Sequence, residues 1–425
     1  MSEGRKWTVM IYMAADNNLS VQGHRDLARM KEVGSSDEVA IVAQYDPGNT
    51  RPTNRYFLKK GGLPHHDVVE TLGETNTGNP STLMEFVQWG ITNYPSNHYM
   101  IVLWGHSGGA LDKDFWFNTD SEENNENNSH TIANGQPMID PNNFAEKSGF
   151  SSDDSAMSNF AAGDEGVSPD DESEDFIDNI ELKEAFLEIT NQLGRKLDII
   201  GVDGCQMGML EVAYQIQHSA DLYIASEALT PRSGWVYEKS LDRLRHNPAL
   251  TPLEFSKLIV TDYLEKTPSD DNPTLSVSAL SHLSENSNTQ LYEAVDQLAV
   301  KMIELLGQNE ILEQILSARK NTLNFGDPIE DQDGENYIDL YDFCWRLESL
   351  TQNVSLINCC RAVRQCFSPN GYVVFSGAKG AKSDAKGLTI YFPLQEIEET
   401  YTTTHLDFLK DKKWLNFLEN LIQVS

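Results

Sequence analysis

The sequence is poor in basic residues, cysteine and long apolar runs, and each shortage argues against a class of protein. Only 32 Lys and Arg stand against 65 Asp and Glu in 425 residues, a formal net charge of −33. Nucleic-acid binders and proteins that dock on anionic lipid need a basic surface, so neither class is expected. Five cysteines without a Cys-x-x-Cys pair argue against a disulfide scaffold and a zinc ribbon. No apolar run reaches the roughly 18–20 residues that a membrane span needs.

The first apolar run has some features of a targeting segment. Residues 7–15 (WTVMIYMAA) follow Arg5 and Lys6 and end in small residues, as a signal peptide would. The run is short and Asp16 follows at once, so we interpret it as a buried strand. A cytoplasmic location is expected by default, with secretion left open.

The first half of the chain alternates apolar strand patterns with amphipathic helix patterns. This alternation predicts an α/β fold with a mostly parallel central sheet covered by helices on both faces. Functional residues of such sheets collect at the carboxyl ends of the strands. The predicted strands are residues 7–15, 39–46, 98–104, 196–202 and 220–226, and the predicted helices are 19–33, 80–94, 180–193 and 206–218.

The second half is more helical. Helices are predicted at residues 251–264, 290–306, 311–319, 337–350, 356–366 and 405–422, with late strands at 371–377 and 387–393. We therefore predict a main domain of residues 1–270 and a mainly helical C-terminal subdomain of residues 271–425. The late strands are free to rejoin the main sheet.

Residues 111–178 interrupt the alternation. They show no sustained period, and the stretch from Asp112 to Asp178 holds 18 acids against two bases, Lys113 and Lys147. A long segment of this kind inside a domain is either functional or disordered. Three interpretations stay open: a solvated linker, a cation-binding loop and a removable activation segment.

Two predicted strand ends carry residues suited to nucleophilic catalysis. One strand ends at His106 among glycines (YMIVLWGHSGGA), and another ends at Asp203-Gly204-Cys205, before a predicted helix (KLDIIGVDGCQMGM). A helix N-terminus stabilises a thiolate, and a histidine on a neighbouring strand can take the thiol proton. Asp16-Asn17-Asn18, after the first strand, either line the same site or form a turn and helix cap.

Two other functions remain open at this point. Gly105 to Gly109 (GHSGG) match the G-x-S-x-G nucleophile elbow of serine hydrolases, with Ser107 as the nucleophile. That elbow runs directly into a helix, whereas this sequence runs into the acidic insertion. The remaining alternative is a catalytically silent, acidic interaction module on the same fold.

Several ordered motifs resemble the clostripain family, cysteine endopeptidases with a caspase-like fold. The motifs are WTVMIYMAADNNL (7–19), LWGHSGGA (103–110), DGCQMGMLEV (203–212), SGWVY (233–237), IDLYDF (338–343) and GLTIYFP (387–393). The likeness covers most of the chain. It implies a caspase-like sandwich, protein or peptide substrates and a catalytic His106–Cys205 dyad.

The resemblance also implies finer roles. The backbone N–H groups of Ser107 and Cys205 would bind the oxyanion, and Asp203 would give a preference for Arg or Lys before the scissile bond. Members are often activated by a cut between the His and Cys segments, which here would fall at Lys147 or, with less support, at Lys113. The cleaved fragments are expected to stay together. The chemistry needs no cofactor and no metal, although some members respond to calcium.

The sequence departs from the family pattern near both catalytic residues. Ser107 stands where the family usually has glycine, and Ala110 replaces an aromatic residue. Arg232 and Ser233 occupy a loop that often carries an acid. The predicted basic preference therefore depends on Asp203.

Overall fold

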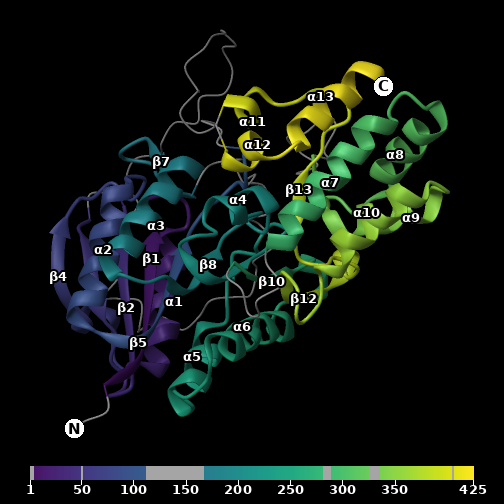
Figure 1. Ribbon diagram of the computed structural model, residues 1–425. Coiled ribbons are helices and arrows are strands. Elements are labelled where there is room, and N and C mark those ends of the chain that lie inside the picture. Colours follow the sequence, from purple (N-terminus) through teal and green to yellow (C-terminus); the bar gives the residue numbers. More distant parts are fainter. Residues whose placement is uncertain (1–3, 49–50, 112–166, 281–288, 326–335, 404–405) are drawn as a thin grey trace.

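The centre of the computed structural model is a nine-stranded sheet with the order β12-β10-β9-β8-β5-β1-β2-β3-β4 (Figure 1). The structure describes residues 4–48, 51–111, 167–280, 289–325, 336–403 and 406–425. The nine strands are β1 (Arg5–Ala14), β2 (Val39–Asp46), β3 (Thr53–Phe57), β4 (Val68–Gly73), β5 (Ser96–Trp104), β8 (Leu197–Asp203), β9 (Ala220–Ala225), β10 (Thr274–Ala279) and β12 (Val373–Ala378).

The five central strands, β9, β8, β5, β1 and β2, run parallel, and the outer strands pair antiparallel. The prediction of a mostly parallel central sheet is therefore confirmed. Its central strands are mostly apolar because helices cover both faces; β2, for example, is buried at every position. Sequence patterns missed β3, β4 and β10.

Helices lie on both faces of the sheet (Figure 1). One face packs against α1, α5 and α6, and the other against α2, α3 and the C-terminal helices. The helices are α1 (Ser20–Val33), α2 (Pro80–Asn93), α3 (Asn179–Leu193), α4 (Leu210–Gln215), α5 (Tyr237–His246), α6 (Pro252–Lys266), α7 (Thr289–Leu305), α8 (Asn309–Asn321), α9 (Leu340–Leu350), α10 (Val354–Gln365), α11 (Glu399–Thr403), α12 (Asp407–Asp411) and α13 (Trp414–Val424). In the described residues, no helix is long and apolar enough to cross a membrane.

Two predicted helix starts owe their position to side-chain caps. Asn79 accepts a hydrogen bond from the backbone N–H of Ser81, and Pro80 takes the first helical position of α2. Thr251 and Glu254 form a reciprocal capping box at the start of α6.

The C-terminal part continues the main sheet and adds a separate ribbon. β12 pairs with β10 at one end of the sheet, so the late strand at 371–377 does rejoin it. The other late strand, β13 (Thr389–Tyr391), pairs with β11 (Tyr337–Asp339). The buried carboxylate of Glu211 joins α4 to this part, because it accepts hydrogen bonds from the Tyr391 N–H and the Tyr401 hydroxyl. The division at residue 270 stays a prediction.

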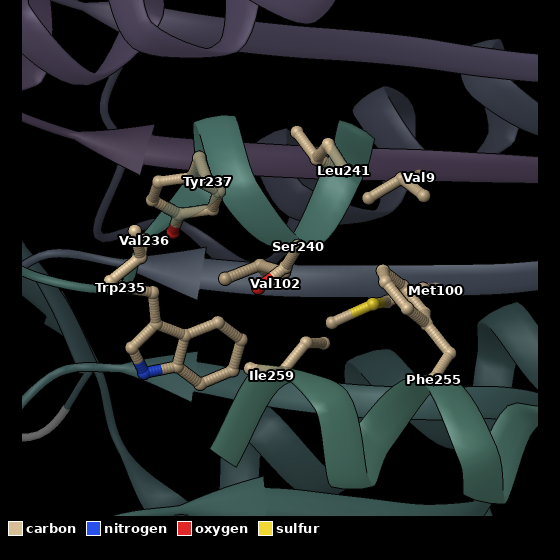
Figure 2. A pocket seen from close by; sticks show the side chains of 10 residues that line it. All are labelled: Val9, Met100, Val102, Trp235, Val236, Tyr237, Ser240, Leu241, Phe255 and Ile259. Atoms are coloured by element: carbon tan, nitrogen blue, oxygen red, sulfur yellow. The ribbon is translucent and has the colours of Figure 1, made fainter. Parts of the chain in front are cut away.

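An apolar cavity lies between the sheet and helices α5 and α6 (Figure 2). Side chains of Met100, Trp235 and Ile259 face one another across it. Its volume is about 10 Å³, which is room for about one water molecule and not for a substrate side chain. We therefore interpret it as a packing void in the core.

Candidate active site

The carboxyl ends of β1, β5 and β8 bring the predicted site residues to one edge of the sheet. β5 pairs with β8 in parallel, with Trp104 opposite Asp203. His106 and Cys205 each lie two residues beyond this pair, so they follow neighbouring strands at the same edge of the sheet. β1 flanks β5 on its other side, with Met13 opposite Trp104, so the loop after β1 lies next to His106.

The loops after β5 and β8 approach each other closely. The Ser107 hydroxyl donates a hydrogen bond to the Cys205 carbonyl over 2.8 Å. The Gly105 N–H reaches the Asp203 carbonyl, with 3.3 Å between N and O. A Cβ on Gly204 would lie 2.4 Å from Ser107 Oγ and 2.8 Å from the Gly105 carbonyl. Only glycine fits there, which explains the glycine between Asp203 and Cys205.

The Cys205 thiol lies beside the loop that follows β9. The Thr230 N–H points at Cys205 Sγ, with 3.3 Å between N and S, and the cysteine is 9% exposed. The Thr230 hydroxyl donates to the Gly204 carbonyl over 2.6 Å. Thr230 thus ties its loop to both residues. A backbone N–H aimed at sulfur favours the thiolate over the thiol.

The helix predicted at residues 206–218 starts later in the structure than the sequence indicates. α4 begins at Leu210, so Cys205 does not lie at a helix N-terminus. The residues between are held out of a helix by the loop after β9: Gln206 N–H donates to the Ala228 carbonyl and Gly208 N–H to the Ser226 carbonyl. Gln206 also has a φ of 55°. The Thr230 N–H, and not a helix N-terminus, therefore lies at the Cys205 sulfur.

His106 is half-buried, and its ring is held by the loop after β1. His106 Nε2 lies 2.7 Å from Asn18 Oδ1. Burial and the nearby Arg232 lower the pKa of His106 to about 4. The imidazole is therefore neutral at physiological pH and able to accept a proton.

Ser107 is 2% exposed, and its hydroxyl is engaged with the Cys205 carbonyl. A nucleophile elbow presents its serine to substrate at the start of a helix, but residues 107–111 are not helical. Ser107 forms an isolated bridge with Val167, near the end of the insertion. It does not have positive φ, so a serine replaces the family's usual glycine without backbone strain.

Asp203 is buried beneath the loop of residues 229–236. Its Oδ2 accepts hydrogen bonds from the Trp235 N–H at 3.0 Å and the Tyr237 hydroxyl at 2.8 Å. Its Oδ1 is buried without a hydrogen-bond partner. Burial raises the pKa of Asp203 to about 6, although the two donors oppose the rise.

The same loop is held from α1. Arg29 donates to the Ser233 carbonyl over 2.9 Å and pairs with the buried carboxylate of Asp26 over 3.0 Å. The loop that covers Asp203 is thereby anchored although it lacks the acid that the family often has there. Arg232 and Ser233 are themselves exposed.

Three carboxylates form a second cluster at the same edge of the sheet. Asp16, Glu74 and Asp170 place an oxygen each within 4.8 Å of one another. Burial raises the pKa of the neighbouring Asp46 to about 6, and the charges of Asp170 and Asp16 add to the rise. Carboxylate oxygens are the donors that Ca²⁺ prefers, so this donor set fits a calcium ion.

The two candidate cleavage residues cannot be placed. Lys113 and Lys147 lie outside the described residues. The end of the insertion is described and forms a hairpin of β6 (Val167–Asp170) and β7 (Asp175–Ile177). The Ser168 N–H donates to the His106 carbonyl, which brings the end of the insertion to the sheet edge where His106 lies.

Comparison with known proteins identifies the family. The family model described as the clostripain family matches residues 11–129 and 154–421, most of the chain. The chain belongs to the clostripain family. It is therefore a cysteine peptidase, and neither the serine-hydrolase nor the silent-module alternative is needed. Peptide hydrolysis in this family needs no cofactor.

Relatives of known structure share the clostripain-family fold over nearly the whole chain. An inactive zymogen C11 protease from Parabacteroides distasonis has a TM-score of 0.62 and 17% identity, covering 98% of this chain and 99% of its own. A secreted C11 cysteine protease from Bacteroides thetaiotaomicron, in complex with an irreversible peptide inhibitor, has a TM-score of 0.60 and 17% identity, covering 96% and 99%. The caspase-like α/β fold is thus confirmed.

A curated relative is clostripain from Hathewaya histolytica. It is 21% identical over 477 residues, which cover 99% of this chain and 81% of the relative. The Bacteroides protein is described as secreted, so the expectation of a cytoplasmic location gains no support from these comparisons.

The sequence of this clostripain-family chain predicts His106, Cys205 and Asp203 as site residues, but it does not predict all of the residues that contact them. Thr230 was missed, because nothing in its local sequence distinguishes it from other loop residues. Asn18 was noted only as a residue that could line the site. The available signal was its place directly after β1, which neighbours the strand of the histidine.

Proposed function

We propose that Cys205 is the nucleophile and His106 the general acid and base of an endopeptidase that cuts after Arg or Lys. The observation that carries this proposal is the parallel register of β5 and β8. Because Trp104 lies opposite Asp203, His106 and Cys205, two residues further on, lie at the same edge of the sheet. The short Ser107–Cys205 hydrogen bond keeps the two loops together.

The proposed reaction begins with proton transfer from the Cys205 thiol to His106, which is neutral and able to accept it. The thiolate attacks the peptide carbonyl carbon. His106 then gives the proton to the leaving amine as the C–N bond breaks, which leaves a thioester on Cys205. Water, deprotonated by His106, hydrolyses the thioester and restores the thiol.

The oxyanion is proposed to bind to the backbone N–H groups of Ser107 and Cys205. The loops that carry these two residues are tied to their surroundings and to each other. Ser107 is held by its bridge to Val167 and by its hydrogen bond to Cys205, and Gly204 permits the close contact. Donors fixed before the reaction stabilise the developing charge without reorganisation.

Asp203 is proposed to select a basic side chain before the scissile bond. Its Oδ1 is buried without a partner, and a guanidinium or ammonium group would supply the missing donor and charge. An uncharged side chain would leave this oxygen unpaired. A pocket built in this way rejects such substrates strongly.

A peptidyl chloromethyl ketone ending in arginine tests this function directly. We expect it to alkylate wild-type protein at Cys205 and to leave Cys205→Ala unlabelled, as read by mass spectrometry of the digested protein. The matched control variant is Cys359→Ala, which removes a partly exposed cysteine far along the chain and should be labelled as wild type. The same reagent ending in glutamate should react much more slowly. Labelling of Cys205→Ala, or faster reaction with the glutamate reagent, would contradict the proposal.

We further propose that cleavage in the acidic insertion activates the enzyme and that the two fragments stay together. β5 precedes the insertion and β8 follows it, yet they are neighbours in the sheet over five register pairs. The Asn179 side chain also donates to the Gly109 carbonyl across the cut. A break between residues 112 and 166 therefore leaves the sheet intact.

Lys147 is the proposed cleavage point, since an enzyme that cuts after Arg or Lys finds only Lys147 and Lys113 there. We expect active wild-type protein to contain two co-purifying fragments, the second beginning at Ser148, and Cys205→Ala to stay intact. Lys147→Ala should remain one chain with reduced activity, whereas the matched variant Lys113→Ala should be cut normally. N-terminal sequencing and mass spectrometry give the readout. Full activity of an unbroken wild-type chain would refute the activation role.

The calcium response expected from the resemblance stays a prediction. Asp16, Glu74 and Asp170 are the residues that would hold the ion. An ion there would neutralise repulsion among carboxylates at β6, a strand near the end of the insertion.

A further inference from the structure

Asn18 makes a contact with His106 that the dyad chemistry described above does not use. Its Oδ1 lies 2.7 Å from His106 Nε2. It comes from the loop after β1, which is adjacent to β5 in the sheet (Figure 1). The contact thus joins two loops that are 88 residues apart in the chain.

An amide oxygen only accepts hydrogen bonds, so the contact has a chemical consequence. Nε2 must carry the ring proton, which leaves Nδ1 with the lone pair that accepts the thiol proton. A neutral imidazole without such a partner carries its proton on either nitrogen, and one of the two tautomers cannot act as the base.

The Asn18 amide is uncharged, and this affects the protonation state of His106. A carboxylate at the same place would favour the imidazolium form through its charge. The amide orients the ring and still leaves His106 with a lowered pKa of about 4. The resting enzyme therefore keeps a neutral base, and the amide oxygen stabilises the imidazolium only when it forms during the reaction.

Asn18 is itself held by the turn that contains it. The Asn17 side chain donates to the carbonyls of Ala14 and Pro169, each over 3.2 Å, and accepts from the Leu19 N–H at 2.9 Å. The turn is therefore fixed to the end of β1 and to β6. β6 in turn reaches His106, because the Ser168 N–H donates to the His106 carbonyl. One short strand thus fixes both partners of the contact.

We propose that Asn18 is a positioning residue that holds His106 in the Nε2–H tautomer, with Nδ1 turned toward Cys205. This inference rests on the proposed His106–Cys205 dyad. It adds a third residue to the reaction: Asn18 does not touch substrate and acts through the histidine.

Three variants of the full chain test the inference: Asn18→Ala, Asn18→Asp and, as the matched control, Asn97→Ala at an exposed position near the start of β5. At metal sites, losing the residue that orients a histidine ligand typically costs 10–100-fold in activity. We expect Asn18→Ala to lower kcat by about this factor with KM changed less than about twofold. Asn97→Ala should match wild type in kcat, KM and thermal stability.

The rate at which iodoacetamide alkylates Cys205 at pH 7 is a second measurement. It should not change if Asn18 has a purely structural role. The rate follows the thiolate fraction, which His106 sets by taking the thiol proton. We expect Asn18→Ala to react about tenfold or more slowly, in line with the kcat loss. Asn18→Asp should react at least as fast as wild type, because its carboxylate accepts the same hydrogen bond and favours the imidazolium. The expected alkylation rate is therefore highest with Asp at position 18, lower with Asn and lowest with Ala.

Histidine ¹⁵N spectra separate this inference from the dyad itself. Wild type should show His106 as the Nε2–H tautomer, assigned by comparison with His106→Ala, and Asn18→Ala should show a mixture. If His106→Ala is inactive but Asn18→Ala keeps wild-type kcat, alkylation rate and tautomer, the role of Asn18 is overturned and the dyad stands. If His106→Ala is fully active, the dyad itself has failed. Should Asn18→Ala not fold, a tenfold slower alkylation in Asn18→Asp would equally overturn the inference.

Discussion

Replacing Cys205 by alanine is expected to lower peptidase turnover by about three to six orders of magnitude, and His106→Ala by a similar factor. The double variant should lose little more than either single variant. The two side chains act as one unit, because a thiol without its base is a poor nucleophile and a base without its thiol has nothing to activate. The measurement is steady-state kcat and KM on one peptide substrate.

Matched controls separate the loss of chemistry from a loss of folding. Cys359→Ala and His246→Ala remove the same side-chain types from more exposed positions, the α10 surface and the end of α5. Both should keep wild-type kinetics, and the Cys205 and His106 variants should unfold at wild-type temperatures. Normal peptidase activity in purified Cys205→Ala would refute the dyad. Strictly additive losses in the double variant would show that the residues act independently.

The sequence predicted the central sheet well because its strands are short, apolar and separated by capped helices. β2 was placed at residues 39–46, and α2 was placed from its Asn79 cap and Pro80. The outer strands are harder to predict from the sequence. β10 contains Thr274, Ser276 and Ser278, and its buried polar side chains break the apolar pattern that identified the others.

Residues directly after the strands could be predicted to share a site, but contacts made by the loops could not. A parallel sheet brings the residues after neighbouring strands together, so His106 and Cys205 could be paired from sequence. The contacts of Thr230 with the thiol and of Asn18 with the imidazole depend on how loops fold back, which no local period records. The error at Gln206 has the same origin. Apolar spacing suggested a helix, but hydrogen bonds from Gln206 and Gly208 to the loop after β9 hold this segment in a non-helical conformation.

Replacing Asp203 by asparagine is expected to abolish the preference for Arg and Lys. The side chain keeps an oxygen for the Trp235 N–H and the Tyr237 hydroxyl but loses its charge. Removing one member of a buried charge pair costs about 3–4 kcal/mol, so kcat/KM for an arginyl substrate should fall about 10²–10³-fold. Alkylation of Cys205 by uncharged iodoacetamide should be nearly unchanged, because the dyad is intact. A peptide-library profile of wild type that shows cleavage after Asp, Asn or Leu would contradict this assignment.

The pH profile of the wild type gives an independent test of Asp203. Burial raises its pKa to about 6, so below that pH the carboxyl is protonated and cannot pair with a guanidinium. Because kcat/KM reports ionisations of the free enzyme, its value for arginyl substrates should fall as pH drops through about 6. His106, with a pKa of about 4, stays neutral in this range and cannot cause the fall. Bound substrate stabilises the carboxylate, so kcat should stay constant to a lower pH than kcat/KM does.

Tyr237→Phe removes a donor that stabilises the carboxylate and should move the fall in kcat/KM to higher pH. A profile that is flat down to pH 5, or unmoved by Tyr237→Phe, would show that Asp203 does not bind the substrate's charge.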